Sequence, residues 1–482
     1  MSIVEILLAI ILVYYGVLFG LYALLIVIGA TQLRTHRLGV RFDEFQRIAN
    51  SPLTMPFSVI IPAYNEELVI VNTLLSALNL RYPEHEIIVV NDGSRDRTLA
   101  ILIERFGLRP SSRVAQNRLP TKPVAAVYQS PDYPNLLVVD KANGKRPDAI
   151  NAGANYARCP LLCMIDADSM LEEDALLHTV RPFLRDPNVI AAGGMVRPAN
   201  GLTIIDGRIT GFGVPRNGLA LMQAIEYLRS FQWARLGLAR LGSLLCISGA
   251  YMAVKKEVFV QMGGCDTGTI TDDIEFTVRL NKYAHEHKGA VRPRIEFVPD
   301  AVCYTEVPES HRVYAAQRNR WQRGTLQALL WHWRMTFNAR YGMAGLLGMP
   351  FYLLFEAFAA IVEGLSMLLI PFVIWFNIAT PGQVAVYLGL AILLGTLLSI
   401  SAVLLQETTR LRVERTSDLV RLLLASIVET FLYHPLHLVW RIAGTFDYFV
   451  RRRTDFGLMT RYGSYQQPPP KPPAAASSLG KA

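Results

Sequence analysis

An uncharged run of 25 residues near the start of the chain, residues 6–30, constrains the fold more than any other feature of the sequence. As a helix, this run is long enough to cross the hydrocarbon core of a bilayer. It is too long for the apolar part of a signal peptide, and the residues MSIVE before it include no basic one. The basic segment RTHRLGVR follows, and by the positive-inside rule it places the chain from residue 31 onward in the cytoplasm.

Three more apolar segments lie toward the other end of the chain. Residues 344–376 are interrupted only by Glu356 and Glu363, which either line a sugar channel or hydrogen-bond to neighbouring helices. Residues 384–405 carry no charge. Residues 418–447 contain charged residues and a proline, so this segment could cross the membrane, kink, lie at the interface or pack among other helices. We expect the C-terminus to stay cytoplasmic.

The net charge of +9 comes with arginines concentrated beside apolar segments. Nucleic-acid binding is one interpretation of such basicity. Arginines next to membrane segments favour contact with anionic lipid headgroups, so we expect a lipid bilayer and no nucleic acid as a partner. The five cysteines lack the spacing of a zinc site, and Cys159 and Cys163 are expected to fill the core.

Short apolar runs alternate with helical stretches between about residues 55 and 305. This alternation indicates βαβ units around a mostly parallel sheet, a fold that binds ligands at the carboxyl ends of its strands. Polar residues follow several of the predicted strands at that edge: Asn65, Asp92, Asp140 and Asp166.

Two pairs of acidic residues stand out within this region. Asp166 and Asp168 would project from the same side of a strand end and repel each other, so they form either a solvated turn or half of a site for a hard metal ion. In GTITDDIEF, Thr271 could cap a helix whose first turn contains Asp272 and Asp273. That second pair is therefore either a capping device or a pair of functional acids.

Five stretches, taken in order and spacing, resemble the family-2 glycosyltransferases, and specifically their membrane-embedded processive group. That group contains the cellulose, hyaluronan, chitin and poly-N-acetylglucosamine synthases. The resemblance covers residues 56–325 and implies an α/β, GT-A-like domain that binds a nucleotide-sugar, with a mixed, mostly parallel sheet flanked by transmembrane helices. The stretches that carry it are VIIPAYNEE (59–67), IIVVNDGSRDRT (87–98), CMIDADSM (163–170), GTITDDIEF (268–276) and QRNRW (317–321).

The resemblance also implies roles for single residues. Asp273 would be the general base, and Asp166 and Asp168 would hold Mg²⁺ or Mn²⁺ against the diphosphate of the donor. Asp92 would bind the uracil. The acceptor would contact Ser248, Gly249 and Trp321. The other residues that bind the donor would be Ala63, Tyr64, Glu66, Arg146, Gln317 and Arg320. Asp166 would contact the donor as well as the metal ion.

One position departs from the family pattern. Many relatives have a lysine five residues before the asparagine of the NAG turn, whereas this chain has Arg146 there and Lys145 beside it. Either cation could meet a phosphate, but the role of the family's lysine does not transfer directly.

The pattern of segments and the resemblance together divide the chain as follows: an anchor with a basic collar at 1–50, a cytosolic glycosyltransferase domain at 51–325, an interfacial helix at 326–343, transmembrane helices at 344–447, a basic cytosolic segment at 448–465 and a disordered tail at 466–482.

The predicted function is an inverting β-glycosyltransferase of the plasma membrane with a cytosolic catalytic domain. It would transfer N-acetylglucosamine or glucose from a UDP-sugar to a growing polysaccharide and pass the product outward, with accessory or export subunits as further partners. Two alternatives are a membrane glycosyltransferase that adds one sugar to a lipid, and a non-catalytic membrane protein that binds a nucleotide-sugar or polysaccharide. A non-catalytic protein would be expected to have lost some of its acids. The chain keeps all four aspartates to which the resemblance gives roles, which favours an enzyme: Asp92, Asp166, Asp168 and Asp273.

Overall fold

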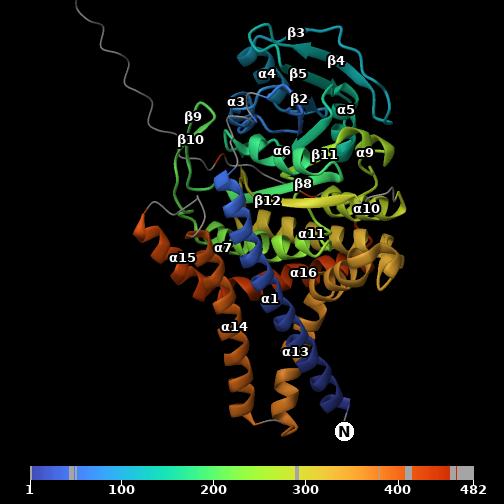
Figure 1. Ribbon diagram of the computed structural model, residues 1–482. Helices are drawn as coiled ribbons and strands as arrows, with labels where there is room; N and C mark the ends of the chain where they lie inside the picture. Colours follow the sequence, from blue (N-terminus) through green and yellow to red (C-terminus); the bar gives the residue numbers. More distant parts are fainter. Residues whose placement is uncertain are drawn as a thin grey trace, which may run out of the picture.

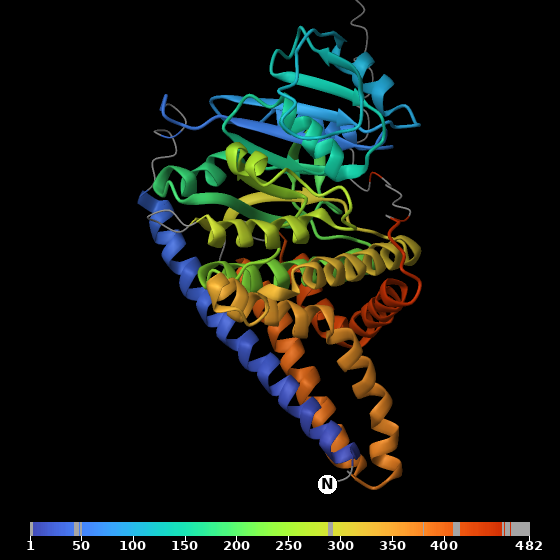
Figure 2. The ribbon, with the colours of Figure 1, turned by 90° about the vertical axis from the view of Figure 1, so that its right-hand side faces the viewer.

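The computed structural model has an α/β domain stacked on a layer of helices, below which the apolar helices α1 (Ile3–Phe42), α13 (Ala359–Trp375) and α14 (Pro381–Glu407) extend (Figures 1 and 2). The main sheet has ten strands in the order β3-β4-β5-β2-β1-β6-β11-β8-β12-β7, and β9 and β10 form a separate hairpin. The structure describes residues 3–42, 48, 51–287, 293–378, 380–407, 415–455, 457 and 463.

The main sheet is mixed, with most strands running in one direction. Strands β4, β7 and β11 run against the other seven. This confirms the predicted α/β fold with a mostly parallel sheet. The strands are β1 (Phe57–Ala63), β2 (His85–Asn91), β3 (Arg109–Pro110), β4 (Val124–Gln129), β5 (Leu136–Lys141), β6 (Leu161–Ile165), β7 (Ser169–Leu171), β8 (Val189–Pro198), β9 (Thr203–Ile205), β10 (Arg208–Gly211), β11 (Tyr251–Lys255) and β12 (Arg294–Thr305).

Central strands of this sheet are apolar along their whole length because both of their faces are covered. Every residue of β1 is buried, and all of β2 except its first residue is buried. The helices of the α/β domain are α3 (Ile70–Leu78), α4 (Thr98–Phe106), α5 (Lys145–Tyr156), α6 (Ala175–Arg185), α9 (Lys256–Gln261) and α10 (Asp272–Glu286).

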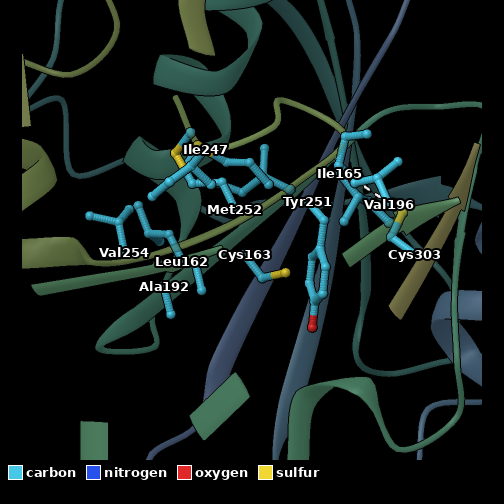
Figure 3. Close-up of a cluster of buried hydrophobic side chains, with 14 of the residues drawn as sticks. Leu162, Cys163, Ile165, Ala192, Val196, Ile247, Tyr251, Met252, Val254 and Cys303 are labelled. Carbon is cyan, nitrogen blue, oxygen red and sulfur yellow. Dashed lines mark hydrogen bonds between the residues drawn. The ribbon is translucent and has the colours of Figure 1, made fainter. Parts of the chain in front are cut away.

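Strand β11 is inserted antiparallel between β6 and β8, and its side chains form much of the core beside the site (Figure 3). The buried ring of Tyr251 fills the space above Gly194, where a Cβ would lie only 2.1 Å from a ring carbon. Cys163 and Cys303 are buried in the same cluster. Because β11 begins opposite Ile165, the last residue of β6, the turn before β11 lies next to the acids that follow β6.

A layer of helices separates this domain from the apolar helices. It consists of α7 (Gly218–Leu228), the π-helical η1 (Arg229–Arg235), α8 (Leu236–Arg240) and α11 (His311–Trp331). Helix α11 crosses the predicted domain boundary at 325–326, and two short 3₁₀ turns, Trp333–Met335 and Ala339–Tyr341, follow it.

Among the described residues, three helices are long and apolar enough to cross a membrane, and a bent pair of helices could supply a fourth crossing. The three contain Ile6–Arg34, Pro381–Leu404 and Thr416–Phe449. The bent pair, Ala344–Ala357 and Ala359–Trp375, turns by 43° at Phe358, so the predicted segment 344–376 is not one straight helix. The first two correspond to α1 (Ile3–Phe42) and α14 (Pro381–Glu407), and the last arm of the pair is α13 (Ala359–Trp375).

The N-terminal end of α1 and the link between α13 and α14 lie at the same end of the molecule, far from the α/β domain (Figures 1 and 2). Side chains on α13 reach neighbouring helices: Glu363 pairs with His434 at 3.2 Å. That contact favours hydrogen bonding between helices, one of the two alternatives for this glutamate.

The last predicted segment, 418–447, forms α15 (Thr416–Val428), the π-helical η6 (Glu429–Tyr433) and α16 (His434–Phe449). Figure 1 shows α16 beneath α11, across the base of the helical layer, rather than alongside α13 and α14. Its contact with α11 is close: a Cβ on Gly444 would lie 2.8 Å from the carbonyl oxygen of Asn319. This packing favours a helix buried among its neighbours. The predicted disordered tail, 466–482, lies outside the described residues.

Candidate active site

Strands β1 and β2 deliver the first predicted donor-binding residues to one edge of the sheet. They are parallel, with Ala63 opposite Asn91, and the amide of Asp92 donates to the carbonyl of Ala63 at 2.9 Å. Tyr64 follows and is 43% exposed. The backbone amide of Glu66 donates to the Thr98 hydroxyl at 2.8 Å, which ties the loop after β1 to the helix start after β2.

Asp92 is almost completely buried, unlike Tyr64 beside it. Its carboxylate accepts hydrogen bonds from the Lys141 ammonium at 2.6 Å and from the amide of Gly144 at 3.0 Å. Burial raises the pKa of the Asp92 carboxyl, although both of these hydrogen bonds favour its charged form. The sequence analysis did not identify Lys141. The sequence feature that could have identified it is its position directly after the apolar run LLVVD, at the edge of the sheet where ligands bind.

The two acids after β6 have different surroundings. The Asp166 side chain is 30% exposed and pairs with the Arg146 guanidinium at 2.8 Å. Asp168 is buried and accepts from the hydroxyls of Thr305 at 3.2 Å and Ser169 at 3.4 Å. A solvated turn would leave both carboxylates in water. The burial of Asp168 therefore favours the other alternative, half of a site for a hard metal ion.

Arg146 connects the two acidic motifs. Its guanidinium pairs with Asp166 and with Asp272, and it also donates to the carbonyl oxygen of Gly249 at 2.7 Å. Burial alone would lower the pKa of Arg146, but the nearby carboxylates outweigh it and raise the pKa, so the guanidinium stays charged. Arg146 lines a small pocket together with Met164, Gly249, Met252, Cys265, Asp272, Asp273 and Phe276.

Asp273 lies in this pocket at the start of α10. One carboxylate oxygen accepts from the amide of Gly249 at 3.3 Å, and the other accepts from the amide of Ile274 at 2.9 Å. Thr271 occupies the N-cap position but its side chain makes no capping hydrogen bond. The capping interpretation of this motif therefore lacks its main contact, and the geometry favours functional acids.

The turn before β11 contributes the remaining predicted acceptor residues. The carbonyl of Ser248 accepts from the amide of Tyr251 at 3.1 Å, which closes a tight turn. Gly249 within this turn contacts Arg146 through its carbonyl and Asp273 through its amide. A short backbone segment thus bridges the residues predicted for donor binding and for catalysis.

The QRNRW stretch lies in α11, which packs against the loop before α10. The amide of Ile270 donates to Gln327 at 2.7 Å, and a Cβ on Gly324 would collide with Thr271. Gln317 and Arg320 are buried and Trp321 is partly buried.

Arg318, between the predicted motif residues of α11, has a structural role that the sequence analysis missed. It forms two hydrogen bonds with Glu226 at 2.7 and 2.8 Å, and its guanidinium carbon lies 4.3 Å from the centre of the Trp321 ring. The pairing fixes α11 to α7, and the stacking holds the tryptophan ring in place. Gln317 offers a different feature, since its Oε1 atom is buried without a hydrogen-bond partner among the described residues.

The acids after β6 supply carboxylate oxygens, the type of ligand that a divalent cation such as Mg²⁺ prefers. The described part of the chain contains no group of three or more histidine, cysteine, aspartate or glutamate side chains that could enclose a metal by itself. Magnesium usually needs only one or two carboxylates when a substrate supplies phosphate oxygens. Asp166 and Asp168 provide that number, and the Asp166 side chain is partly exposed.

Comparison with known proteins places these residues in a family. The model of the glycosyltransferase-like family 2 matches residues 55–324, and the chitin synthase model matches residues 287–454. Poly-beta-1,6-N-acetyl-D-glucosamine synthase from Staphylococcus epidermidis is 28% identical over 274 residues, 57% of this chain and 55% of the relative. The probable glycosyltransferase YdaM of Bacillus subtilis is 29% identical over 278 residues, 57% of this chain and 56% of the relative.

The chain spans about half the length of the curated relatives it matches. Among solved structures, a mannosyltransferase from Pyrobaculum calidifontis, determined with GDP-mannose and Mn²⁺, aligns with 90% of this chain and all of its own at a TM-score of 0.48 and 18% identity. That likeness is too low to bear on function.

Proposed function

The chain belongs to the glycosyltransferase-like family 2, and from this premise we propose that it is an inverting β-glycosyltransferase that transfers a sugar from a UDP-sugar to a growing polysaccharide. One observation carries the proposal: Arg146, which lines the pocket with Asp272 and Asp273, also pairs with Asp166 of the donor motif. One side chain therefore links Asp166 of the proposed metal site to the acidic pair at the start of α10.

We assign the donor to the edge formed by β1, β2 and β6. Asp92 would accept a hydrogen bond from the uracil, beside Ala63, Tyr64 and Glu66. Asp166 and Asp168 would hold Mg²⁺ or Mn²⁺, which when bound offsets the negative charge on the departing UDP. Arg146, Gln317 and Arg320 are the groups assigned to the diphosphate.

We assign the acceptor to the side of the pocket formed by the turn before β11, with Trp321 of α11 as a further contact. Asp273 would take the proton from the acceptor hydroxyl. Inversion requires this base on the face of the sugar opposite the leaving group, and its position on α10, separate from the donor motifs, supports that role. Ser248 and Gly249 would position the acceptor, and the ring of Trp321 would stack on a sugar.

The relatives support a polysaccharide product and N-acetylglucosamine as a donor sugar, with glucose as the other candidate. We place the α/β domain in the cytosol and the α13–α14 link outside the plasma membrane, with polymer export coupled to synthesis and accessory or export subunits as partners. The apolar helices below the α/β domain support this arrangement. Transfer of one sugar to a lipid is the second candidate, because an apolar acceptor would also reach a site above these helices.

The decisive experiment incubates the purified protein in detergent with individual UDP-sugars and Mg²⁺, and measures both UDP release and product size. A high polymer supports the proposal, whereas a lipid carrying one sugar supports the second candidate. UDP release from none of the sugars would contradict both.

Asp273→Asn provides the matched control for that assay. It removes the proposed base while keeping the size of the side chain, so turnover should fall by a factor of about 10² or more. Affinity for UDP should remain nearly that of the wild type. Unchanged turnover would remove Asp273 from its proposed role.

A further inference from the structure

Three charged residues are buried together behind the proposed uracil contact. The Lys141 side chain is completely buried, and its ammonium lies 2.6 Å from Asp92 and 2.5 Å from Asp148. The side chains of these two acids are only 3% and 6% exposed. Burying charged groups is costly even when they are paired, and here two acids share one cation. Packing alone therefore does not explain the cluster.

The cluster contacts both carboxylate oxygens of Asp92. Oδ1 accepts from Lys141 and from the amide of Gly144, Oδ2 accepts from the same amide at 3.2 Å, and the backbone carbonyl accepts from Asn143 at 2.7 Å. Gly144 passes so close to Asp148 that a Cβ would lie 2.3 Å from that carboxylate. A carboxylate has about four lone-pair directions, so Asp92 can still accept a hydrogen bond from a ligand.

Lys141 is the cation that keeps Asp92 ionised. The charged groups that face Asp92 in the described structure are Lys141, from the end of β5, and Asp148 of α5 on the far side of the ammonium. The amides of Gly144 and Lys145 also favour the charged form. Burial already raises the pKa of Asp92 with Lys141 in place, so removal of the ammonium would raise that pKa further.

The protonation state of Asp92 decides which base it can bind. An ionised carboxylate only accepts hydrogen bonds, whereas a protonated carboxyl also donates one. Uracil presents a donor at N3, and cytosine presents an acceptor at the same position. A site that pairs with one of these groups leaves a polar atom unsatisfied when the other base binds.

We propose that Lys141 is a specificity-determining positioning residue, which holds Asp92 ionised so that the site selects uridine over cytidine nucleotides. The inference rests on the proposed function, since it requires the base of a nucleotide donor to contact Asp92. It extends that function to a residue that does not itself touch the substrate.

The test measures binding of UDP and of CDP to the full-length protein in detergent by calorimetry, with Mg²⁺, at pH 6 and pH 8. Lys141→Met alone leaves two buried acids without their cation and so destabilises the fold; the main variant is therefore Lys141→Met combined with Asp148→Asn. This pair of changes keeps the net charge of the cluster. Asp148→Asn alone is the control, because it alters the same cluster but leaves Lys141 beside Asp92. Thermal denaturation reports on the fold of each variant.

In the wild type and in Asp148→Asn, UDP should bind more tightly than CDP at both pH values. In the double variant, the ratio of the two affinities should fall by about tenfold or more, and further at pH 6, where Asp92 is more fully protonated. A general loss of stability would weaken both nucleotides alike and leave the ratio unchanged.

Two results would overturn the inference alone: an unchanged ratio in the double variant, or an equal loss of selectivity in Asp148→Asn. A wild type that binds UDP no more tightly than CDP would overturn the proposed uridine donor as well. The failure of the inference and the failure of the proposed function are thus separate results.

Discussion

At the scale of single residues, the geometry of the pocket depends on the choice of arginine at position 146. A guanidinium presents five N–H donors in a planar fork, so one side chain can contact Asp166, Asp272 and the carbonyl of Gly249 together. A lysine, which the family pattern has here, is a point charge on a flexible stem. The departure from the pattern therefore adds a connection between motifs that a lysine would make less rigidly.

Arg146→Lys tests this connection. The variant keeps the positive charge but cannot reproduce the three contacts, so kcat/KM for the UDP-sugar should fall by about 10- to 100-fold. Steady-state kinetics of UDP release would measure the change.

Arg113→Lys is the matched control for that substitution. Arg113 is also a largely buried arginine that contacts a carboxylate, Glu86, and a carbonyl, that of Tyr156, each at 2.6 Å. It lies near the start of β2, at the opposite end of the strand from Asp92, and its replacement should leave kcat/KM nearly unchanged. Equal losses in the two variants would mean that the effect arises from stability rather than from the site.

At the scale of elements, antiparallel β11 is what brings the acceptor turn to the donor acids. Its first residue, Tyr251, pairs with Ile165 at the end of β6, and the same tyrosine ring packs against Gly194 of β8. The position of this strand in the sheet thus depends on contacts with both of its neighbours.

Gly194→Ala tests the fit of β11 against β8. A methyl group would overlap the Tyr251 ring, and the ring cannot move freely because its hydroxyl donates to the carbonyl of Ala175 at 3.1 Å. Overpacking of this kind typically costs about 1–3 kcal/mol, so the Tm should fall by several degrees. Gly218→Ala, at a position where a Cβ meets no atom within 4 Å, should leave the Tm nearly unchanged. Similar values for both variants would contradict the proposed packing.

The sequence predicted the elements better than their order in the sheet. The apolar runs ending at Ala63, Asn91 and Ile165 are strands, because a strand covered on both faces must be apolar throughout. The insertion of β11 could not be predicted, since sheet order depends on contacts between residues far apart in the chain.

The same limit applied to the site. The sequence pointed to Asp166 and Asp272 separately, but their common partner Arg146 is 20 residues from one and 126 from the other, and no local pattern encodes that contact. The buried position of Lys141 likewise depends on its two partners, Asp92 and Asp148, which come from separate elements of the domain.

At the scale of the whole molecule, the apolar helices and the α/β domain lie at opposite ends of a helical layer (Figure 2). The N-terminal end of α1 and the α13–α14 link share the far end, while α16 remains against α11. If the far end is outside the cell, the basic residues at the C-terminal end of α1 and those after α16 both lie on the cytosolic side. The positive-inside rule requires this distribution, and a crossing α16 would violate it.

Cysteine labelling in intact cells with a membrane-impermeant maleimide tests this topology. Thr380→Cys, in the exposed α13–α14 link, should react without permeabilisation. The Arg451 side chain is 61% exposed just beyond α16. Arg451→Cys should react only after the membrane is opened, because α14 returns the chain to the cytosolic side and α16 stays there, packed under α11. The parent protein is the control for its own five cysteines, all of which belong to the α/β domain and the helical layer. Labelling of both positions in intact cells would mean that α15 and α16 cross the membrane together, and the packing of α16 against the QRNRW helix would then be incompatible with a cytosolic active site.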